Sequence, residues 1–198
     1  MSKIAINVVI LPPEKIMDLV IAINKEEASR INSKGELNKI DFLPHLSLAM
    51  GTIKKEDLDR VKKIVTKTSQ EFEIMNLILA EPYYVIKNEN KRSYVLRVKG
   101  KQLQKFHERL MARLNSFLSF DATKEEIYNQ ESEPTYINKY KRIGCLRRYE
   151  PHITVRCKEL SYKTKEISFL AKRVAICHVG ISTTCRKILF ETELGKTN

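Results

Sequence analysis

A short pattern occurs twice in this sequence of 198 residues, and its repetition constrains the fold more than any other feature. The first copy reads Pro-His-Leu-Ser-Leu over residues 44–48, and the second reads Pro-His-Ile-Thr-Val over residues 151–155. Each copy sets a histidine and a hydroxyl two positions apart, with apolar residues between and after them. Because side chains alternate between the faces of a strand, each copy predicts a strand with one polar and one apolar face.

The predicted polar faces carry side chains that can do chemistry. His45 and Ser47 share a face in the first copy, and His152, Thr154 and Arg156 share a face in the second. The apolar faces require a core. We expect the two strands to lie together, so that two imidazoles and two hydroxyls line one cleft.

Apolar periodicity and turn residues predict the other elements. Strands are expected over 4–10, 45–50, 72–80, 83–86, 93–98, 173–181 and 186–193, with helices around Ile16 to Ile23, after an N-cap at Thr52, and over 101–120. The segment 121–150 lacks periodicity and is predicted to be a long loop or lid with a short helix near 124–129. The order repeats a strand–helix unit, which suggests two pseudo-symmetric lobes within a single domain spanning residues 1–198.

The charge of the chain favours an anionic partner. Lys and Arg outnumber Asp and Glu by 36 to 24, for a net charge of +12. Such a balance suits nucleic acid, nucleotides or an acidic membrane surface, and it equally suits a lysine-rich surface that keeps the protein soluble. The segment 139–148 has five basic residues and no acidic one, so it could bind an RNA backbone or form a solvated loop.

The cysteines and the N-terminus indicate a cytoplasmic protein. The four cysteines, at 145, 157, 177 and 185, form no CxxC pair and no spacing typical of zinc or of a disulfide framework, so we expect free or buried thiols. The apolar run at residues 4–11 is too short to span a membrane and has no small-residue cleavage site. No membrane partner is expected, and we expect a monomer.

The duplicated side chains suit the cleavage of a phosphodiester. Histidine can act as a base or an acid near neutral pH, because its unperturbed pKa is about 6.5. Ser and Thr hydroxyls can donate to phosphoryl oxygens, and Arg156 can offset their charge. No carboxylate cluster with metal spacing is visible, so we expect neither a metal nor a cofactor.

The repeated His-apolar-hydroxyl-apolar motif, in a basic chain of this size, resembles the 2H phosphoesterase superfamily, and most of all its 2′-5′ RNA ligase-like (LigT-like) proteins and cyclic phosphodiesterases. The resemblance extends from Ile4 to about Glu193. It implies a bilobal α+β fold with two antiparallel-sheet lobes, outer helices and a central cleft. It assigns catalysis to His45 with Ser47 and to His152 with Thr154, although Ser replaces the commoner Thr in the first motif.

Three functions remain open from the sequence. The leading one is a metal-independent phosphodiesterase that opens 2′,3′-cyclic phosphates or cleaves 2′-5′ linkages in RNA or nucleotides. The second is a cyclic-dinucleotide hydrolase that uses the same side chains, and the third is an RNA-binding module without turnover. The presence of both histidines and both hydroxyls favours an enzyme, because a binder needs only positive charge and stacking.

Two further histidines and two aromatic residues are also candidates for the site. His107 lies near the apolar stripe of a predicted helix and His178 lies in a late strand without a hydroxyl two residues on, so both are predicted to be structural. Phe42 and Tyr149 each stand three positions before a motif histidine. They could stack on bases, but three positions along a strand points to the opposite face, which favours packing.

Overall fold

One antiparallel sheet forms the framework of the computed structural model, which describes residues 2–29, 36–88, 91–155 and 165–195. Its strands are β1 (Lys3–Leu11), β2 (Leu46–Lys54), β3 (Met75–Asn88), β4 (Lys91–Lys99), β5 (His152–Thr154), β6 (Ile167–Ala171), β7 (Arg173–Val179) and β8 (Cys185–Glu193). The hydrogen-bonded order is β6-β3-β4-β5-β2-β1-β7-β8, and all pairs are antiparallel. The predicted α+β class with antiparallel sheets is confirmed.

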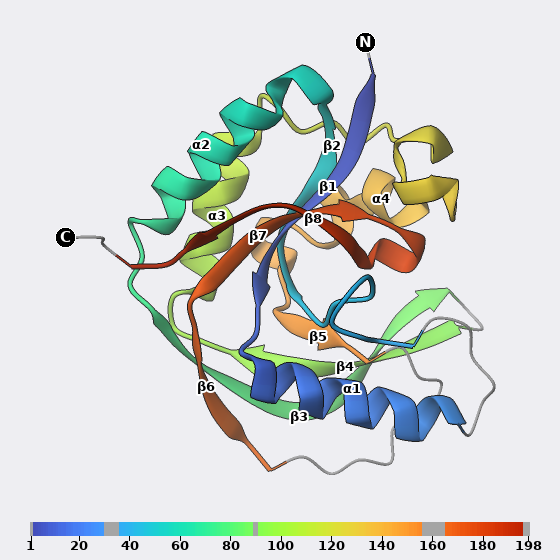
Figure 1. Cartoon of the computed structure of the whole chain (residues 1–198), viewed down its shortest axis with the longest axis vertical. Coiled ribbons are helices and arrows are strands. Elements are labelled where there is room, and N and C mark those ends of the chain that lie inside the picture. The colour runs from blue at the N-terminus through green and yellow to red at the C-terminus, as the bar shows by residue number, and fades with distance from the viewer. Residues whose placement is uncertain (1, 30–35, 89–90, 156–164, 196–198) are drawn as a thin grey trace.

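The sheet consists of two four-stranded halves that meet at the two motif strands. One half is β6-β3-β4-β5 and the other is β2-β1-β7-β8, and β5 pairs with β2 at Leu46 and Ile153. In Figure 1 the first and last strands of the chain, blue and red, lie in the same half, whereas the green β3 and β4 belong to the other. The two lobes implied by the resemblance are therefore halves of one continuous sheet.

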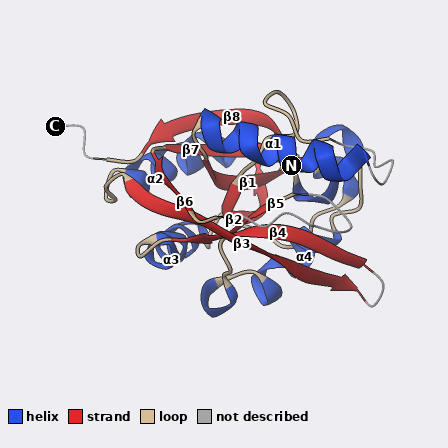
Figure 2. Cartoon of the chain, turned by 90° about the horizontal axis from the view of Figure 1, so that it is seen from below, coloured by secondary structure: helices blue, strands red, loops and turns tan. Residues whose placement is uncertain are grey.

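Four helices accompany the sheet in the described part of the chain: α1 (Glu14–Ser29), α2 (Leu58–Ser69), α3 (Leu103–Leu114) and α4 (Thr135–Ile143). Figure 2 shows α1 on one side of β3 and β4, and α3 and α4 on the other side. α3 and α4 pack against β2, and α2 packs against α3 and β8. Because the helices cover the apolar faces, strand residues such as Leu46, Leu48 and Ile153 are fully buried.

The first motif strand is longer than the sequence indicated, which makes the predicted N-cap wrong. Thr52 lies within β2, where it pairs with Ala5 and exchanges backbone hydrogen bonds with Ser119. Gly51 permits this close approach, since a Cβ at that position would lie 3.0 Å from the Ser119 carbonyl oxygen. The next helix, α2, accordingly begins at Leu58 rather than directly after Thr52.

The segment 121–150 contains more regular structure than its lack of periodicity suggested. Short 3₁₀ turns occupy 124–126, 128–130 and 146–148, which agrees with the helical turn expected near 124–129, and α4 was not predicted. α4 follows Pro134, buries Ile137 and Tyr140 three positions apart, and ends at Ile143 with Gly144 as its C-cap. Two buried residues in nine give too short an apolar stripe to recognise as a helix from sequence.

Candidate active site

The pairing of β2 with β5 brings the two motifs into register. Leu46 pairs with Ile153 in antiparallel orientation, and both side chains are buried on one face of the sheet. Antiparallel register then sets Ser47 opposite His152 and His45 opposite Thr154 on the other face, where directly opposed Cβ atoms lie about 4.5–5.5 Å apart. The structure thus groups the four motif side chains, each of them partly exposed.

The two histidines make the same backbone hydrogen bond. The Nδ1–H of His45 donates to the Leu43 carbonyl over 2.8 Å, and the Nδ1–H of His152 donates to the Glu150 carbonyl over 2.7 Å. A carbonyl can only accept, so Nδ1 carries the proton in both rings. Each neutral imidazole therefore has Nε2 as its unprotonated nitrogen, which is the atom available to take or return a proton.

The surroundings of His45 favour its neutral form. Burial lowers the pKa of His45 from 6.5 to about 4; the hydrogen bond to Leu43 opposes this change and the charge of His152 adds to it. The amide Nδ2 of Asn7, on β1, lies 3.5 Å from Nε2 of His45. The same amide donates to Ser47 Oγ over 2.8 Å. At neutral pH His45 is thus an uncharged imidazole with its accepting nitrogen beside an amide donor.

His152 has a different environment, formed by β3 and β4. Arg97 is its register partner on β4 and therefore shares its face of the sheet. The guanidinium of Arg97 lies 4.6 Å from the centre of the Tyr83 ring and pairs with Glu81 at 3.2 Å, and Tyr83 meets the His152 ring edge-on at 6.5 Å. Burial, with the Glu150 carboxylate second, raises the pKa of Tyr83 to about 12. No local pattern in the sequence marks Arg97, because only the register relates it to His152.

Two side chains from outside the sheet hold the first residues of β2. β5 is only three residues long, so it does not extend along β2 beyond the motif. The Tyr149 hydroxyl donates to the Ser47 carbonyl over 3.0 Å, and the Nδ1–H of His107 donates to the Leu48 carbonyl over 2.5 Å. The two rings stack with centroids 4.0 Å apart. Tyr149 and His107 thus have packing roles, as predicted.

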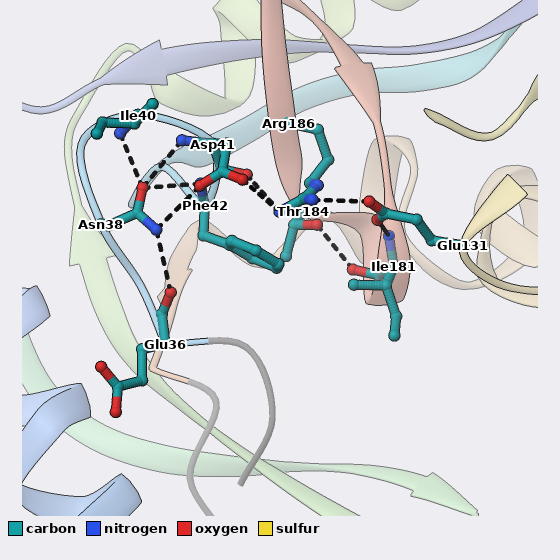
Figure 3. A network of polar contacts seen from close by, with 9 residues as sticks. All are labelled: Glu36, Asn38, Ile40, Asp41, Phe42, Glu131, Ile181, Thr184 and Arg186. Atoms are coloured by element: carbon teal, nitrogen blue, oxygen red, sulfur yellow. Dashed lines mark hydrogen bonds and ion pairs between the residues drawn. The ribbon is translucent and has the colours of Figure 1, made fainter. Parts of the chain in front are cut away.

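A polar network holds the loop that leads into His45 (Figure 3). Arg186 on β8 donates to the Asp41 carbonyl over 2.8 Å, pairs with Glu131 at 2.7 Å, and stacks 3.7 Å above the Phe42 ring. The Asn38 side-chain oxygen accepts backbone N–H groups from 40, 41 and 42. Phe42 is thereby engaged in packing, which agrees with the preferred interpretation of its position.

Two predicted residues remain, Arg156 and His178, and the structure describes the second of them. Arg156 lies outside the described residues, so its expected phosphate contact stays a prediction. His178 is half-buried, and its Nε2 is 2.9 Å from the Glu126 carbonyl, which agrees with a structural role. Among the described residues no three His, Cys, Asp or Glu side chains are grouped as a metal ion would require.

The expectation of free thiols is wrong for two of the four cysteines. Cys177 on β7 and Cys185 on β8 form a disulfide, with Cα atoms 5.4 Å apart. The bond joins neighbouring strands, a relation that an eight-residue separation does not reveal in the sequence. Cys145 is a free, buried thiol, and burial raises its pKa to about 11. Cys157 lies outside the described residues.

The basic segment 139–148 forms an exposed, positively charged surface. A hollow of about 440 Å³ is lined by Glu108, Lys141, Arg142, Cys145, Leu146, Arg147 and Arg148. In the described part of the chain, none of the basic residues of 139–148 forms an ion pair with a carboxylate. The turn at 146–148 is fixed to α3, because the Leu146 N–H donates to His107 Nε2 over 2.7 Å and its carbonyl accepts from Gln104.

Similarity to known proteins lies in the fold. No protein-family model and no curated protein sequence matches the chain. Among solved structures, TT0787 of Thermus thermophilus superposes with a TM-score of 0.63 at 12% identity, over 98% of this chain and 100% of that one. Escherichia coli LigT complexed with NADP⁺ gives 0.57 at 13% identity, over 98% and 99% of the two chains. LigT complexed with 3′-AMP gives 0.52 at 11% identity, over 96% and 97%.

These likenesses define the class to which the fold belongs. Nearly the whole of this chain and nearly the whole of each neighbour are covered, so the match concerns the complete arrangement of strands and helices. The chain has the LigT-like fold that the sequence resemblance implied. In the described residues, no helix has the length and apolar character needed to cross a membrane.

Proposed function

We propose that this protein is a metal-independent phosphodiesterase of the 2H phosphoesterase type, acting on 2′,3′-cyclic phosphates or 2′-5′ linkages of RNA or nucleotides. The observation that carries the proposal is the β2–β5 register. This register sets Ser47 opposite His152 and His45 opposite Thr154 on one face of the sheet. Both imidazoles carry their proton on Nδ1. The LigT-like fold supports the same class.

The proposed reaction needs two imidazoles in opposite protonation states. In the opening of a 2′,3′-cyclic phosphate, a water oxygen attacks phosphorus while its proton passes to the Nε2 of a neutral imidazole. The bond from phosphorus to one ribose oxygen breaks, and that oxygen takes a proton from the other, protonated imidazole. One water is consumed and a phosphomonoester forms. Ser47 and Thr154 hydroxyls donate to the phosphoryl oxygens, whose charge rises in the transition state.

The proposed substrate class rests on charge and on the ligands of a protein with the same fold. LigT has been crystallised with NADP⁺, ATP and 3′-AMP, which are phosphate-bearing nucleotides. This chain carries +12 overall, and its 139–148 surface has cations without carboxylate partners among the described residues. Arg97, beside His152, offers a further cation. An anionic nucleotide or RNA end suits these features.

A turnover panel in EDTA tests the proposal. It comprises 2′,3′-cyclic nucleotides, 2′-5′ and 3′-5′ dinucleotides and cyclic dinucleotides. The wild type is compared with His45→Ala/His152→Ala and with His178→Ala, a matched loss of an imidazole away from the site. We expect turnover of a cyclic phosphate or a 2′-5′ linkage by the wild type and by His178→Ala, and none by the folded double variant.

The other results identify the alternatives. Turnover confined to cyclic dinucleotides would make the protein a cyclic-dinucleotide hydrolase. Equal RNA binding by wild type and double variant, without turnover of any substrate, would leave a non-catalytic RNA-binding module. Activity that EDTA abolishes and a divalent ion restores would contradict metal independence. The cytoplasmic location and the monomeric state stay predictions, which fractionation and light scattering can test.

A further inference from the structure

Asn7 is a buried polar side chain in an otherwise apolar strand. β1 is apolar from Ile4 to Leu11 except at Asn7, and it pairs with β2 on one side and β7 on the other. The side chain is 0% exposed, and its Oδ1 has no hydrogen-bond partner. Burying an amide without full pairing destabilises the folded state. An apolar residue would suit the sheet better, so the amide calls for an explanation outside the packing of β1.

The amide contacts both polar members of the first motif. Asn7 Nδ2 donates to Ser47 Oγ over 2.8 Å and lies 3.5 Å from His45 Nε2. Because His45 carries its proton on Nδ1, Nε2 can only accept while the ring is neutral. The group facing it must then be a donor. This fixes the amide with Nδ2 toward the motif and leaves Oδ1 as the unpaired atom.

We propose that Asn7 is a positioning residue that makes His45 the neutral base of the pair and directs the Ser47 hydroxyl proton toward the substrate. This inference rests on the proposed phosphodiesterase function. It assigns His152 the opposite role, as the acid that protonates the leaving oxygen.

The two effects follow from the donor character of the Asn7 NH₂ group, which has one N–H for Ser47 and one for His45. Ser47 Oγ already accepts from Asn7, so its own O–H is free to donate to a phosphoryl oxygen. If His45 were protonated, its Nε2–H would face an N–H of Asn7, and this repulsion favours the neutral ring. Burial acts in the same direction. Among the described residues, the titratable group that acts on His45 is His152 on β5, whose positive charge repels a protonated His45. The neighbours on β1 and β2, Asn7 and Ser47, are uncharged.

Two substitutions at Asn7 separate positioning from packing. Asn7→Asp puts a carboxylate beside Nε2, which stabilises the imidazolium and should raise the pKa of His45 by about 1–3 units. Asn7→Leu removes the donor and also the unpaired oxygen, so we expect unchanged or higher thermal stability. It should lower kcat by about tenfold or more while KM changes little. Asn76→Asp, which adds the same charge at an exposed position on β3, serves as the matched control.

The readout is the titration of His45 by NMR, measured in wild type, Asn7→Asp, Asn7→Leu and Asn76→Asp, together with kcat and KM at each pH. NMR reports on Asn7 even in a protein that turns nothing over, so failure of the inference and failure of the proposed function can be distinguished. A raised His45 pKa in Asn7→Asp, absent in Asn76→Asp, supports the inference. An unchanged His45 pKa in Asn7→Asp overturns it.

If Asn7→Asp does not fold, Asn7→Leu decides the question. A higher His45 pKa than in the wild type, with reduced kcat, supports the inference. Wild-type kcat and an unchanged His45 titration in folded Asn7→Leu overturn it. A loss of thermal stability together with an unchanged His45 titration would mean that Asn7 serves packing alone, and this also overturns the inference.

Discussion

The two motifs have the same sequence pattern and the same backbone hydrogen bond, but their surroundings differ. His45 immediately precedes the nine-residue β2, and it is beside the uncharged amide of Asn7, with burial that lowers its pKa. His152 lies on the three-residue β5, beside Tyr83 and the exposed Arg97. A duplicated motif can therefore supply two identical groups that the surrounding strands make chemically unequal. General acid–base catalysis requires that inequality.

The hydroxyls offer the largest expected effect short of removing a histidine. Ser47→Ala and Thr154→Val each remove one donor to the phosphoryl oxygens, and loss of such a donor typically lowers kcat about 10²–10³-fold. Ser47→Ala should lower kcat more, because Asn7 orients the Ser47 hydroxyl, whereas Thr154 makes no side-chain hydrogen bond to the described residues. Thermal unfolding of Thr154→Val should match the wild type, since that side chain is partly exposed. Ser47→Ala should unfold at a somewhat lower temperature, because it leaves the buried Asn7 amide without its acceptor. Equal, small effects on kcat would show that Asn7 gives Ser47 no advantage over Thr154 as a donor.

The pH profile tests the inequality of the histidines directly. The pKa of His45 lies near 4, below its usual 6.5, so the ring stays neutral down to acidic pH. The acidic limb of kcat/KM, which reports the base in the free enzyme, should fall near pH 4. The same shift bears on stability: the unfolded chain takes up the proton first as pH drops, so folding stability decreases from about pH 6.5 toward 4. An acidic limb near 6.5 would contradict the base role of His45.

Arg97 gives the smallest expected effect. Arg97→Ala removes a cation on the His152 side of the site, and we expect about a tenfold rise in KM with little change in kcat. Lys99→Ala is the matched control, because Lys99 lies two residues along β4 and pairs with the same carboxylate, Glu81. Steady-state kinetics on a mononucleotide substrate measure both. Equal KM for the two variants would show that Arg97 contributes only general charge.

Sequence alone could predict the parts of this site that depend on strand parity. The spacing of His45 to Ser47 and of His152 to Thr154 determined which side chains share a face, and the apolar partners Leu46 and Ile153 are buried as that spacing required. β1, α1, α3, β7 and β8 likewise follow periodic apolar runs, although the structure shortens the predicted third helix to Leu103–Leu114.

Contacts between strands could not be predicted in this way. Asn7 stands out in sequence as a break in an apolar run, but its partners, His45 just before β2 and Ser47 on β2, are 38 and 40 residues away. Arg97 and the Cys177–Cys185 disulfide likewise depend on registers that no local pattern encodes. β6 is five residues long, and its exposed Leu170 is apolar, so the sequence does not alternate between polar and apolar residues although the burial does.

The central claim is that His45 acts as base and His152 as acid on one phosphodiester. Kinetics with two leaving groups test it most directly. A substrate whose leaving group is a ribose oxygen needs a proton from the acid, whereas an acidic phenol such as p-nitrophenol departs without one. On the ribose substrate, His45→Ala and His152→Ala should each lower kcat/KM about 10²–10⁴-fold. On the p-nitrophenyl diester, His152→Ala should recover most of its activity while His45→Ala stays impaired. Recovery by His45→Ala instead, or by neither variant, would contradict this assignment.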